Sequence, residues 1–220
     1  MRTYVVRDAG LGIQTTYRSE HHGSDYGGWI LCPTALDQDS VVYSLGVGDD
    51  ISFDLSVIER YGATVYAFDA TPKSVQWVHA QQLPGQFRFY EYAVLDHDGT
   101  ATFYPPDNPD WVSYTVCPNQ FATANRAVVV ATRRLSSLMK QLGHTRIDVL
   151  KMDIEGSEYQ VIDDMLRCGI EVRQLLVEFH HRFTGIGMAR TKRTIKALAR
   201  HGYKIFAVSG SGDEVSFIRE

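Results

Sequence analysis

The chain after Ser40 alternates between short apolar runs and segments in which apolar residues recur every three or four positions. Short apolar runs between turn residues predict buried strands, and the longer spacing predicts amphipathic helices. We therefore predict strands at residues 41–45, 64–68 and 87–92, and helices at residues 51–61 and from Thr71-Pro72 onward. The order strand-helix-strand-helix-strand indicates a parallel sheet with right-handed crossovers.

The same alternation continues in the second half of the chain. It predicts helices at residues 135–142, 157–167 and 191–201, separated by strands at residues 148–152 and 174–179. Before these, residues 93–104 predict a hairpin that turns at Asp98-Gly99, and residues 112–116 and 128–132 predict further extended segments. Residues 1–39 show no comparable pattern, so we expect an irregular N-terminal arm that covers a site, followed by one domain over residues 40–220.

The last residues predict two strands, 203–208 and 215–218, joined by the glycine- and serine-rich segment 209–213. A connection this short requires antiparallel strands. We therefore expect a mostly parallel sheet that is closed by a C-terminal antiparallel hairpin. A nicotinamide-binding domain would continue with parallel strand-helix-strand units instead.

Composition narrows the functional classes. The chain has 220 residues, 44% of them hydrophobic, which suits one sizeable core. Its net charge of −4 is unlike that of a nucleic-acid-binding protein, so we expect no nucleic-acid partner. Three separated cysteines, Cys32, Cys117 and Cys168, favour neither a thiolate zinc site nor a disulfide framework. No apolar stretch is long enough to span a membrane. We expect a cytoplasmic location and no membrane partner; the oligomeric state is not predicted.

A glycine loop, Gly46-Val47-Gly48-Asp49-Asp50, follows the first of these strands. Glycine lets the backbone approach a ligand closely, and Asp69 at the end of the next strand is placed to accept hydrogen bonds from ribose hydroxyls. Asp69 is also placed to cap the following helix. Asp49 and Asp50 stand where dinucleotide-binding loops carry a third glycine. Two carboxylates would repel a pyrophosphate but suit a ligand with an amino group and a sulfonium cation.

Further acids and histidines follow two later strands. Asp153 and Glu155 come after residues 148–152, whereas Glu158 fits the acidic start of a helix. His180 and His181 follow residues 174–179, and histidine is the usual general base near neutral pH. We expect His180 to be the base, with His181 as second choice, and Asp153 to act beside it. Alternatively, Asp153 and Glu178 would hold Mg²⁺ and lower the pKa of a bound hydroxyl.

At these motifs the sequence resembles the FkbM-type methyltransferase family. The resemblance rests on four segments: VYSLGVGDDISFD (42–54), VYAFDATPKS (65–74), DVLKMDIEGSE (148–158) and LLVEFHHRF (175–183). It implies an α/β fold of the class I methyltransferase, Rossmann-like type, with a mostly parallel seven-stranded sheet closed by a C-terminal antiparallel hairpin. It also implies S-adenosylmethionine as methyl donor and O-methylation of a hydroxyl on a sugar or small natural product.

The resemblance also implies residue roles. Gly46, Gly48 and Asp49 would line the methionine part of the cofactor, Asp69 would hold the ribose, and Ala93 would lie beside the adenine. Ser44 stands where many class I enzymes have an acid, so we expect Asp49 or Asp153 to hold the cofactor's amino group. Two other classes stay open: a nucleoside-cofactor-binding module without catalysis, and a nicotinamide-dependent oxidoreductase.

Overall fold

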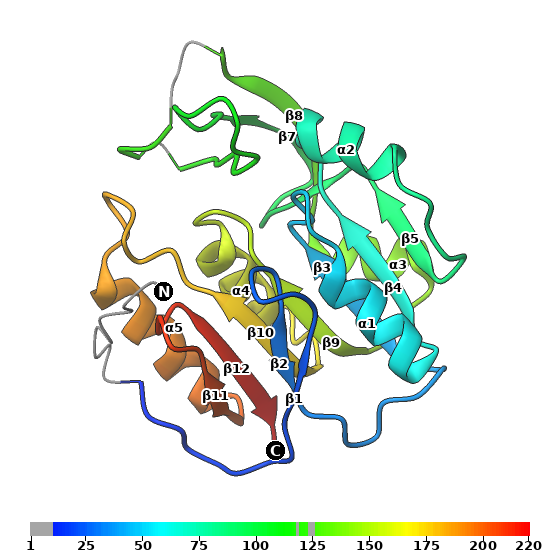
Figure 1. Cartoon of the computed structure of the whole chain (residues 1–220). Coiled ribbons are helices and arrows are strands. Elements are labelled where there is room, and N and C mark those ends of the chain that lie inside the picture. The colour runs from blue at the N-terminus through cyan, green and yellow to red at the C-terminus, as the bar shows by residue number, and fades with distance from the viewer. Residues whose placement is uncertain (1–10, 118, 123–125) are drawn as a thin grey trace.

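A central sheet of seven strands, in the order β11-β12-β10-β9-β3-β4-β5, organises the molecule (Figure 1). The computed structural model describes residues 11–117, 119–122 and 126–220. The strands are β3 (Val41–Leu45), β4 (Thr64–Phe68), β5 (Phe87–Tyr90), β9 (Ile147–Met152), β10 (Val172–Glu178), β11 (Tyr203–Val208) and β12 (Glu214–Arg219). The first five are mutually parallel, and β12 runs antiparallel to both β10 and β11. The predicted fold, with its closing hairpin, is confirmed.

Helices cover both faces of this sheet. They are α1 (Ser52–Tyr61), α2 (Pro72–His79), α3 (Leu135–Leu142), α4 (Glu158–Arg167) and α5 (Met188–Arg200). Side chains of α3, α4 and α5 pack with Tyr43 and Leu45 in one core cluster, whereas α1 and α2 pack with Val42 in another. Because neighbouring residues of a strand point to opposite faces, β3 serves both layers and is buried on each side.

The N-terminal arm contributes structure of its own to the second face. Within its described part, β1 (Glu20–His22) and β2 (Trp29–Leu31) form a short antiparallel pair. Beyond β2, the buried amide of Gln174 donates to the backbone oxygen of Cys32 and accepts from its N–H, both at 2.8 Å. The arm is therefore fastened to the sheet and is more regular than we expected; residues 1–10 lie outside the described part.

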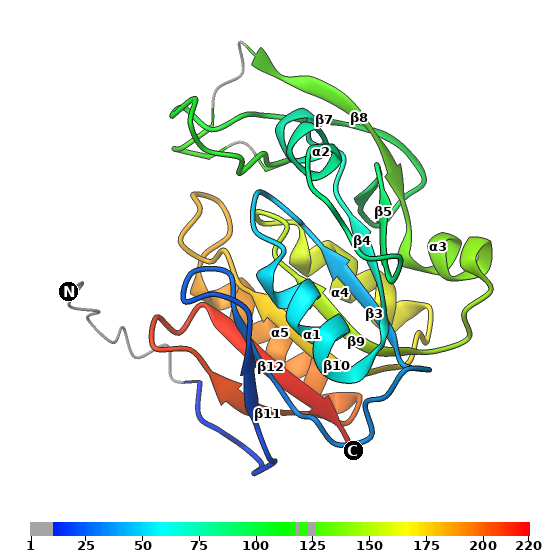
Figure 2. The same cartoon turned by 45° about the vertical axis from the view of Figure 1, so that its right-hand side comes forward.

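A second, three-stranded sheet corrects the predicted hairpin at Asp98-Gly99. It contains β6 (Ala93–Val94), β7 (Gly99–Phe103) and β8 (Val128–Arg133) in the order β6-β8-β7, so β8 separates the two expected partners. The Asp98 carboxylate instead accepts the backbone N–H of Arg134 at 2.8 Å and the hydroxyl of Ser137 at 2.6 Å, at the start of α3. Figure 2 shows β7 and β8 beside α2, far from β11.

The predicted extended segment at residues 112–116 is not a strand. Its contribution to sheet pairing is one isolated bridge, between Thr115 and Tyr104. The preceding residues Val112, Ser113 and Tyr114 face a cleft, where they form part of its wall. The β-branched and aromatic residues of the segment therefore contribute to the wall of a cleft and not to a ladder of hydrogen bonds.

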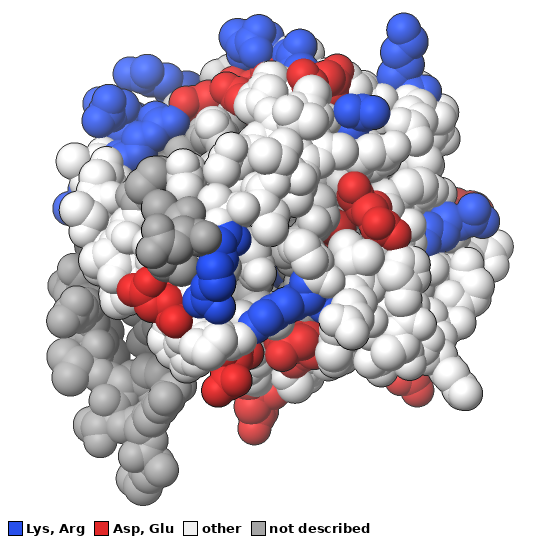
Figure 3. Space-filling model, turned by 90° about the horizontal axis from the view of Figure 1, so that it is seen from above, with Lys and Arg blue, Asp and Glu red and all other residues white. Residues whose placement is uncertain are grey.

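The outer surface carries mixed charge. Figure 3 shows basic and acidic side chains interspersed on the face that it presents. Among the helices of the described part, none is long and apolar enough to cross a membrane.

Candidate active site

A cleft of about 680 Å³ lies at the carboxyl ends of β3, β4, β9 and β10. Open parallel sheets bind ligands at this edge. Its walls are the glycine loop, the segments after β4, β9 and β10, the arm at residues 25–30, and the turn between β11 and β12. The residues assigned from the sequence that line it are Gly46, Gly48, Asp49, Asp69, Ala93, Asp153 and Glu178. His180 and His181 are not among its lining residues.

Two backbone segments approach so closely at Gly46 that no side chain fits there. Its φ is +79°, and a Cβ at this position would lie 1.7 Å from the carbonyl oxygen of Asp153. Its own carbonyl oxygen accepts a hydrogen bond from Lys151 Nζ at 2.5 Å. Gly46 therefore joins β3 to β9, whereas Gly48, also at positive φ, meets only Val112 Cγ2 at 3.5 Å and leaves room toward the cleft.

The carboxylate of Asp69 accepts hydrogen bonds from other groups of the protein. One carboxylate oxygen accepts the backbone N–H groups of Val47 and Gly48, both at 3.1 Å. The other accepts the N–H and the hydroxyl of Thr71, both at 2.8 Å. Asp69 thus holds the glycine loop and the turn into α2 together, in addition to lining the cleft where we expected it to contact a ribose.

The two acids of the glycine loop have different environments. Asp49 is exposed at the cleft, as expected for a ligand-facing carboxylate. Asp50 accepts the hydroxyl of Ser24 at 2.7 Å and the N–H of Ser52 at 2.7 Å. Ser24 Oγ in turn accepts the N–H of Gly27 at 2.9 Å. Asp50 therefore anchors the arm loop over the cleft, a role that the sequence pattern did not indicate.

Apolar residues form the wall around Ala93. Leu95 and Phe103 join Ala93 in one buried cluster, and all three line the cleft. They come from the small sheet that replaced the predicted hairpin. A planar apolar ligand group suits this wall, whereas the opposite wall is strongly acidic.

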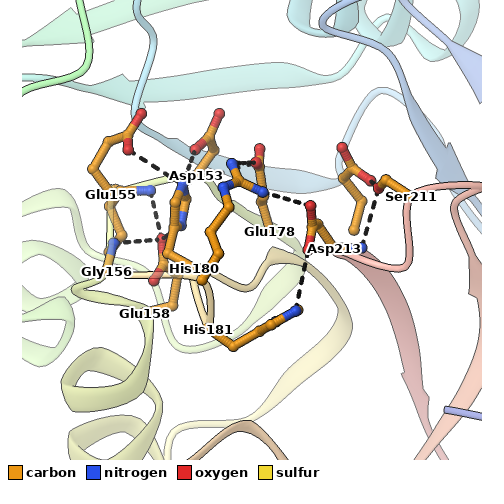
Figure 4. Close-up of polar contacts among 12 residues, drawn as sticks. Asp153, Glu155, Gly156, Glu158, Glu178, His180, His181, Ser211 and Asp213 are labelled. Carbon is orange, nitrogen blue, oxygen red and sulfur yellow. Dashed lines mark hydrogen bonds and ion pairs between the residues drawn. The ribbon is translucent and has the colours of Figure 1, made fainter. Parts of the chain in front are cut away.

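Asp153, Glu155 and Glu178 form that acidic wall. Figure 4 shows their carboxylates side by side above the ring of His180. Glu155 has a φ of +51°, which is uncommon for a residue with a side chain. Its carbonyl oxygen accepts the hydroxyl of the buried Thr115 at 2.6 Å. The loop after β9 is thereby held with its carboxylates directed at the cleft.

His180 lies beneath these carboxylates and is 1% exposed. Its Nδ1 is 2.9 Å from Glu158 Oε1, and its Nε2 is 3.3 Å from Glu155 Oε2 and 3.8 Å from Asp153 Oδ1. Burial alone would lower the pKa of His180, but the surrounding carboxylates raise it well above the ordinary value. A buried imidazole that favours its protonated form does not suit the role of general base that we expected for it.

His181 points away from the cleft, toward the turn between β11 and β12 (Figure 4). Its Nε2 lies 3.4 Å from Asp213 Oδ1. Burial lowers the pKa of His181. The second-choice base is therefore a neighbour of the terminal hairpin and not of the acidic wall.

Glu158 is more than the acidic start of a helix. It is fully buried, and its Oε1 accepts the N–H groups of Ile154 at 3.0 Å and Gly156 at 3.3 Å as well as facing His180 Nδ1. One carboxylate oxygen thus shapes the loop that carries Asp153 and Glu155 and also orients the histidine. The spacing of Glu158 in the sequence fits a helix start equally well, so it gave no separate signal.

Burial and mutual repulsion disfavour the ionised forms of two carboxyl groups in the acidic wall. Burial, and then the neighbouring Asp153, raise the pKa of Glu178 to about 8. Burial also raises the pKa of Asp153 to about 6, against the effect of nearby Lys151. Lys151 and Arg182 line the cleft as well, but Arg182 pairs with Glu178 at 3.2 Å. The cleft therefore favours ligands that bring positive charge.

The donor atoms near one another differ from the expected Asp153–Glu178 metal pair. Within the described residues, Asp153, Glu155 and His180 form a group whose candidate ligand atoms all lie within 4.8 Å of one another. Glu178 is not part of this group, although its Oε1 lies 3.8 Å from His180 Nε2.

Other cleft residues were not found from the sequence. Tyr26, on the arm loop, is 90% exposed at the cleft, and Ser209 and Ser211 come from the terminal turn. Arg182 joins this turn to β10 by pairing with both Glu178 and Asp213. No local motif marks these residues, because they meet the cleft through packing of both ends of the described chain onto one sheet edge.

Comparisons with known proteins show the family of this chain. The family described as "Methyltransferase FkbM domain" matches residues 34–205. Human probable methyltransferase-like protein 24 is 27% identical over 161 residues, covering 70% of this chain and 36% of that protein. The 2-O-methyltransferase NoeI of Sinorhizobium fredii is 25% identical over 137 residues, 56% of each protein. The first relatives are longer proteins, of which this chain spans 36% and 42%.

A solved structure supports the fold. The crystal structure of a methyltransferase FkbM from Methylobacillus flagellatus matches with a TM-score of 0.52 and 11% sequence identity, covering 84% of this chain and 45% of that chain. The family match extends from before β3 into β11 and includes the glycine loop, Asp69 and the acidic wall. The chain belongs to the FkbM methyltransferase family.

Proposed function

We propose that this protein transfers the methyl group of S-adenosylmethionine to a hydroxyl of a small molecule, such as a sugar or natural product. The observation that carries the proposal is the meeting of two walls at one sheet edge. The glycine loop and Asp69 form one wall, and Asp153, Glu155 and Glu178 form the other. The family membership supports methyl transfer as the reaction class.

The residues of the cleft fit this cofactor. Gly48 presents no side chain toward the cleft, and Leu95 and Phe103 offer an apolar wall for the adenine. Asp49 and Asp153 are available to the amino group and sulfonium, which carry positive charge. A pyrophosphate would meet the same carboxylates with repulsion, which disfavours a nicotinamide dinucleotide.

When bound, S-adenosylmethionine supplies a methyl group activated by its sulfonium. The protein's part is to hold the acceptor oxygen in line with that methyl carbon and to exclude water. As the new oxygen–carbon bond forms and the sulfur–carbon bond breaks, the hydroxyl proton needs an acceptor. We assign this role to Glu178, whose carboxylate lines the cleft at the acidic wall.

A hydroxyl acceptor is supported by the relative NoeI, which is a 2-O-methyltransferase. The many carboxylates of the cleft also favour neutral or positively charged acceptors over phosphorylated ones.

Calorimetry with S-adenosylhomocysteine and with NAD tests the cofactor assignment. We expect binding of S-adenosylhomocysteine and none of NAD. Tight binding of NAD without binding of S-adenosylhomocysteine would overturn the proposal and favour an oxidoreductase. Binding of S-adenosylhomocysteine without methyl transfer to any member of a broad panel of hydroxylated acceptors would favour a cofactor-binding module.

With an acceptor in hand, Glu178→Gln tests the base. We expect a loss of turnover of roughly 10²–10⁴-fold, with S-adenosylhomocysteine affinity unchanged. Glu171→Gln, at an exposed position, is the matched control. Unchanged turnover in Glu178→Gln would remove the base assignment while leaving the cofactor assignment intact.

A further inference from the structure

We infer that Asp153, Glu155 and His180 form a binding site for one divalent transition-metal ion at the acidic wall of the cleft. The inference deepens the proposed function, on which it rests, by assigning a metal to the same site. It replaces the Asp153–Glu178 magnesium pair expected from the sequence with a different ligand set and a different class of ion.

The orientation of the His180 ring supports a metal site. Glu158 Oε1 already accepts two backbone N–H groups, so it faces His180 Nδ1 as an acceptor and Nδ1 carries a proton. This leaves Nε2, on a side chain 1% exposed, directed at the carboxylates of Glu155 and Asp153. A bare nitrogen lone pair facing carboxylate oxygens would be repelled, so Nε2 must hold either a proton or a metal ion.

The distances around Nε2 leave room for a metal ion in place of the proton. A charge-assisted N–H···O bond is usually about 2.7–2.9 Å long, and a single proton serves one such bond well. Here Nε2 lies 3.3 Å from Glu155 Oε2 and 3.8 Å from Asp153 Oδ1. Ligands about 2.0–2.3 Å from a common ion stand roughly 3.0–3.7 Å from one another, depending on the coordination angle. The two separations from Nε2 are close to this range, and all three candidate ligand atoms lie within 4.8 Å of one another.

The contact between Glu158 and His180 Nδ1 is of the kind that metal-bound histidines make. A ligating histidine usually donates its other ring N–H to a carboxylate, which fixes the ring and increases its basicity. Glu158, fully buried, supplies this carboxylate, and the same oxygen fixes the backbone between Asp153 and Glu155 at Ile154 and Gly156. One buried glutamate therefore positions all three ligands.

Among the described residues, no lysine or arginine forms an ion pair with Asp153 or Glu155. Lys151 Nζ is bound to the carbonyl oxygen of Gly46, and Arg182 pairs with Glu178 and Asp213. The side chains of Asp153 and Glu155 are 34% and 21% exposed and line the cleft, so an ion held by them keeps open positions toward a ligand.

The ligand chemistry selects the ion. Carboxylates suit Mg²⁺ and Mn²⁺, whereas an imidazole nitrogen suits transition metals. One imidazole with two carboxylates therefore favours an ion such as Mn²⁺ or Fe²⁺ over Mg²⁺. An acceptor hydroxyl bound at an open position would lose its proton more readily, with Glu178 close by to take it.

The inference is tested by titrating the metal-free protein with Mn²⁺. Electron paramagnetic resonance of the free ion and calorimetry both monitor the binding. We expect one Mn²⁺ per chain, with tenfold or more excess Mg²⁺ failing to displace it. Glu155→Gln and Asp153→Asn should each weaken Mn²⁺ binding by at least about tenfold. His201→Ala removes an exposed histidine and should leave binding unchanged.

The outcomes separate this inference from the proposed function. S-adenosylhomocysteine binding to the metal-free protein tests the cofactor site independently of any ion. If wild-type protein binds no Mn²⁺ or Fe²⁺, or if Glu155→Gln and Asp153→Asn bind Mn²⁺ as tightly as wild type, the metal site is refuted. The proton is then the occupant of His180 Nε2. The wild-type titration decides this even if a variant fails to fold.

Discussion

The carboxylate of Asp69 accepts the backbone N–H of Gly48 at 3.1 Å, so the end of β4 directly holds the loop that follows β3. Sequence reasoning assigned Asp69 either to a ribose or to the next helix. In the structure the carboxylate also accepts hydrogen bonds from the glycine loop, in addition to those from Thr71 at the start of the next helix. The two assignments from the sequence are therefore coupled through one side chain.

Asp69→Ala should weaken both the fold and the cofactor site. Asp69 is 8% exposed, and removal of its carboxylate leaves the N–H groups of Val47, Gly48 and Thr71 without their acceptor. We expect S-adenosylhomocysteine affinity to fall by about 1.5–3 kcal/mol, together with a lower melting temperature. Calorimetry and thermal unfolding measure the two effects. Asp96→Asn, at a half-exposed site, is the control; a loss of stability with unchanged affinity would restrict Asp69 to a structural role.

Gly46→Ala and Gly48→Ala form a matched pair. Both positions have positive φ, but a Cβ at Gly46 would lie 1.7 Å from the Asp153 backbone, whereas at Gly48 it meets only Val112 Cγ2 at 3.5 Å. We expect Gly46→Ala to destabilise the protein by more than about 3 kcal/mol and Gly48→Ala by about 1 kcal/mol. Gly48→Ala should instead reduce cofactor affinity. Urea unfolding and calorimetry check both; equal destabilisation would contradict the difference in packing.

The regular part of the fold followed from the sequence because its signals are local. Val42, Tyr43 and Leu45 read as a buried strand, and each is packed against one face of the sheet or the other. The prediction of a hairpin at Asp98-Gly99 was wrong because β8, about thirty residues later in the chain, pairs with both β6 and β7. Local turn chemistry does not report such a partner.

The candidate site likewise contains some residues that local sequence signals predict and others that they do not. Asp153 could be placed because a strand end is a local feature, and it lines the cleft as expected. The burial of His180 could not be predicted, because it depends on Glu158 and on the fold of the intervening loop. The arm residues Ser24 and Tyr26 could not be predicted either, since nothing near them in the sequence marks the cleft.

Ser24→Ala tests whether the arm loop is held by Asp50. Ser24 Oγ donates to Asp50 at 2.7 Å and accepts the N–H of Gly27 at 2.9 Å. We expect faster amide hydrogen exchange at residues 24–28, with a global stability loss of only about 1 kcal/mol. Hydrogen exchange resolved by mass spectrometry measures this. Ser19→Ala, whose hydroxyl bonds the exposed Tyr17 backbone, is the control. Unchanged exchange in Ser24→Ala would show that packing alone holds the loop.

Asp54 makes stability depend on pH. This residue of α1 is 2% exposed, and burial raises its pKa from 3.8 to about 6. Between these values the folded protein keeps a proton that the unfolded chain has lost. The contribution of Asp54 to stability is therefore present at low pH and lost as pH rises from about 4 to 6.

Asp54→Asn should remove this loss. Its free energy of unfolding, relative to wild type, should increase by about 2–3 kcal/mol between pH 4 and pH 7. Urea unfolding at both pH values measures the difference, which also cancels the contributions of other titrating groups. A constant difference between the two proteins would mean that Lys151, which lowers the pKa of Asp54, fully compensates its burial.

The hydroxyl of Ser216 donates to the backbone oxygen of Ile30, a contact that spans 186 positions along the chain. Both residues line the cleft, so its floor combines an early and a late segment. During synthesis on the ribosome, a nascent chain that has reached α5 already contains the glycine loop and the acidic wall but lacks β12. The complete cleft can therefore form only after β12 has emerged. Completion of the cleft is in this sense a late event of biosynthesis.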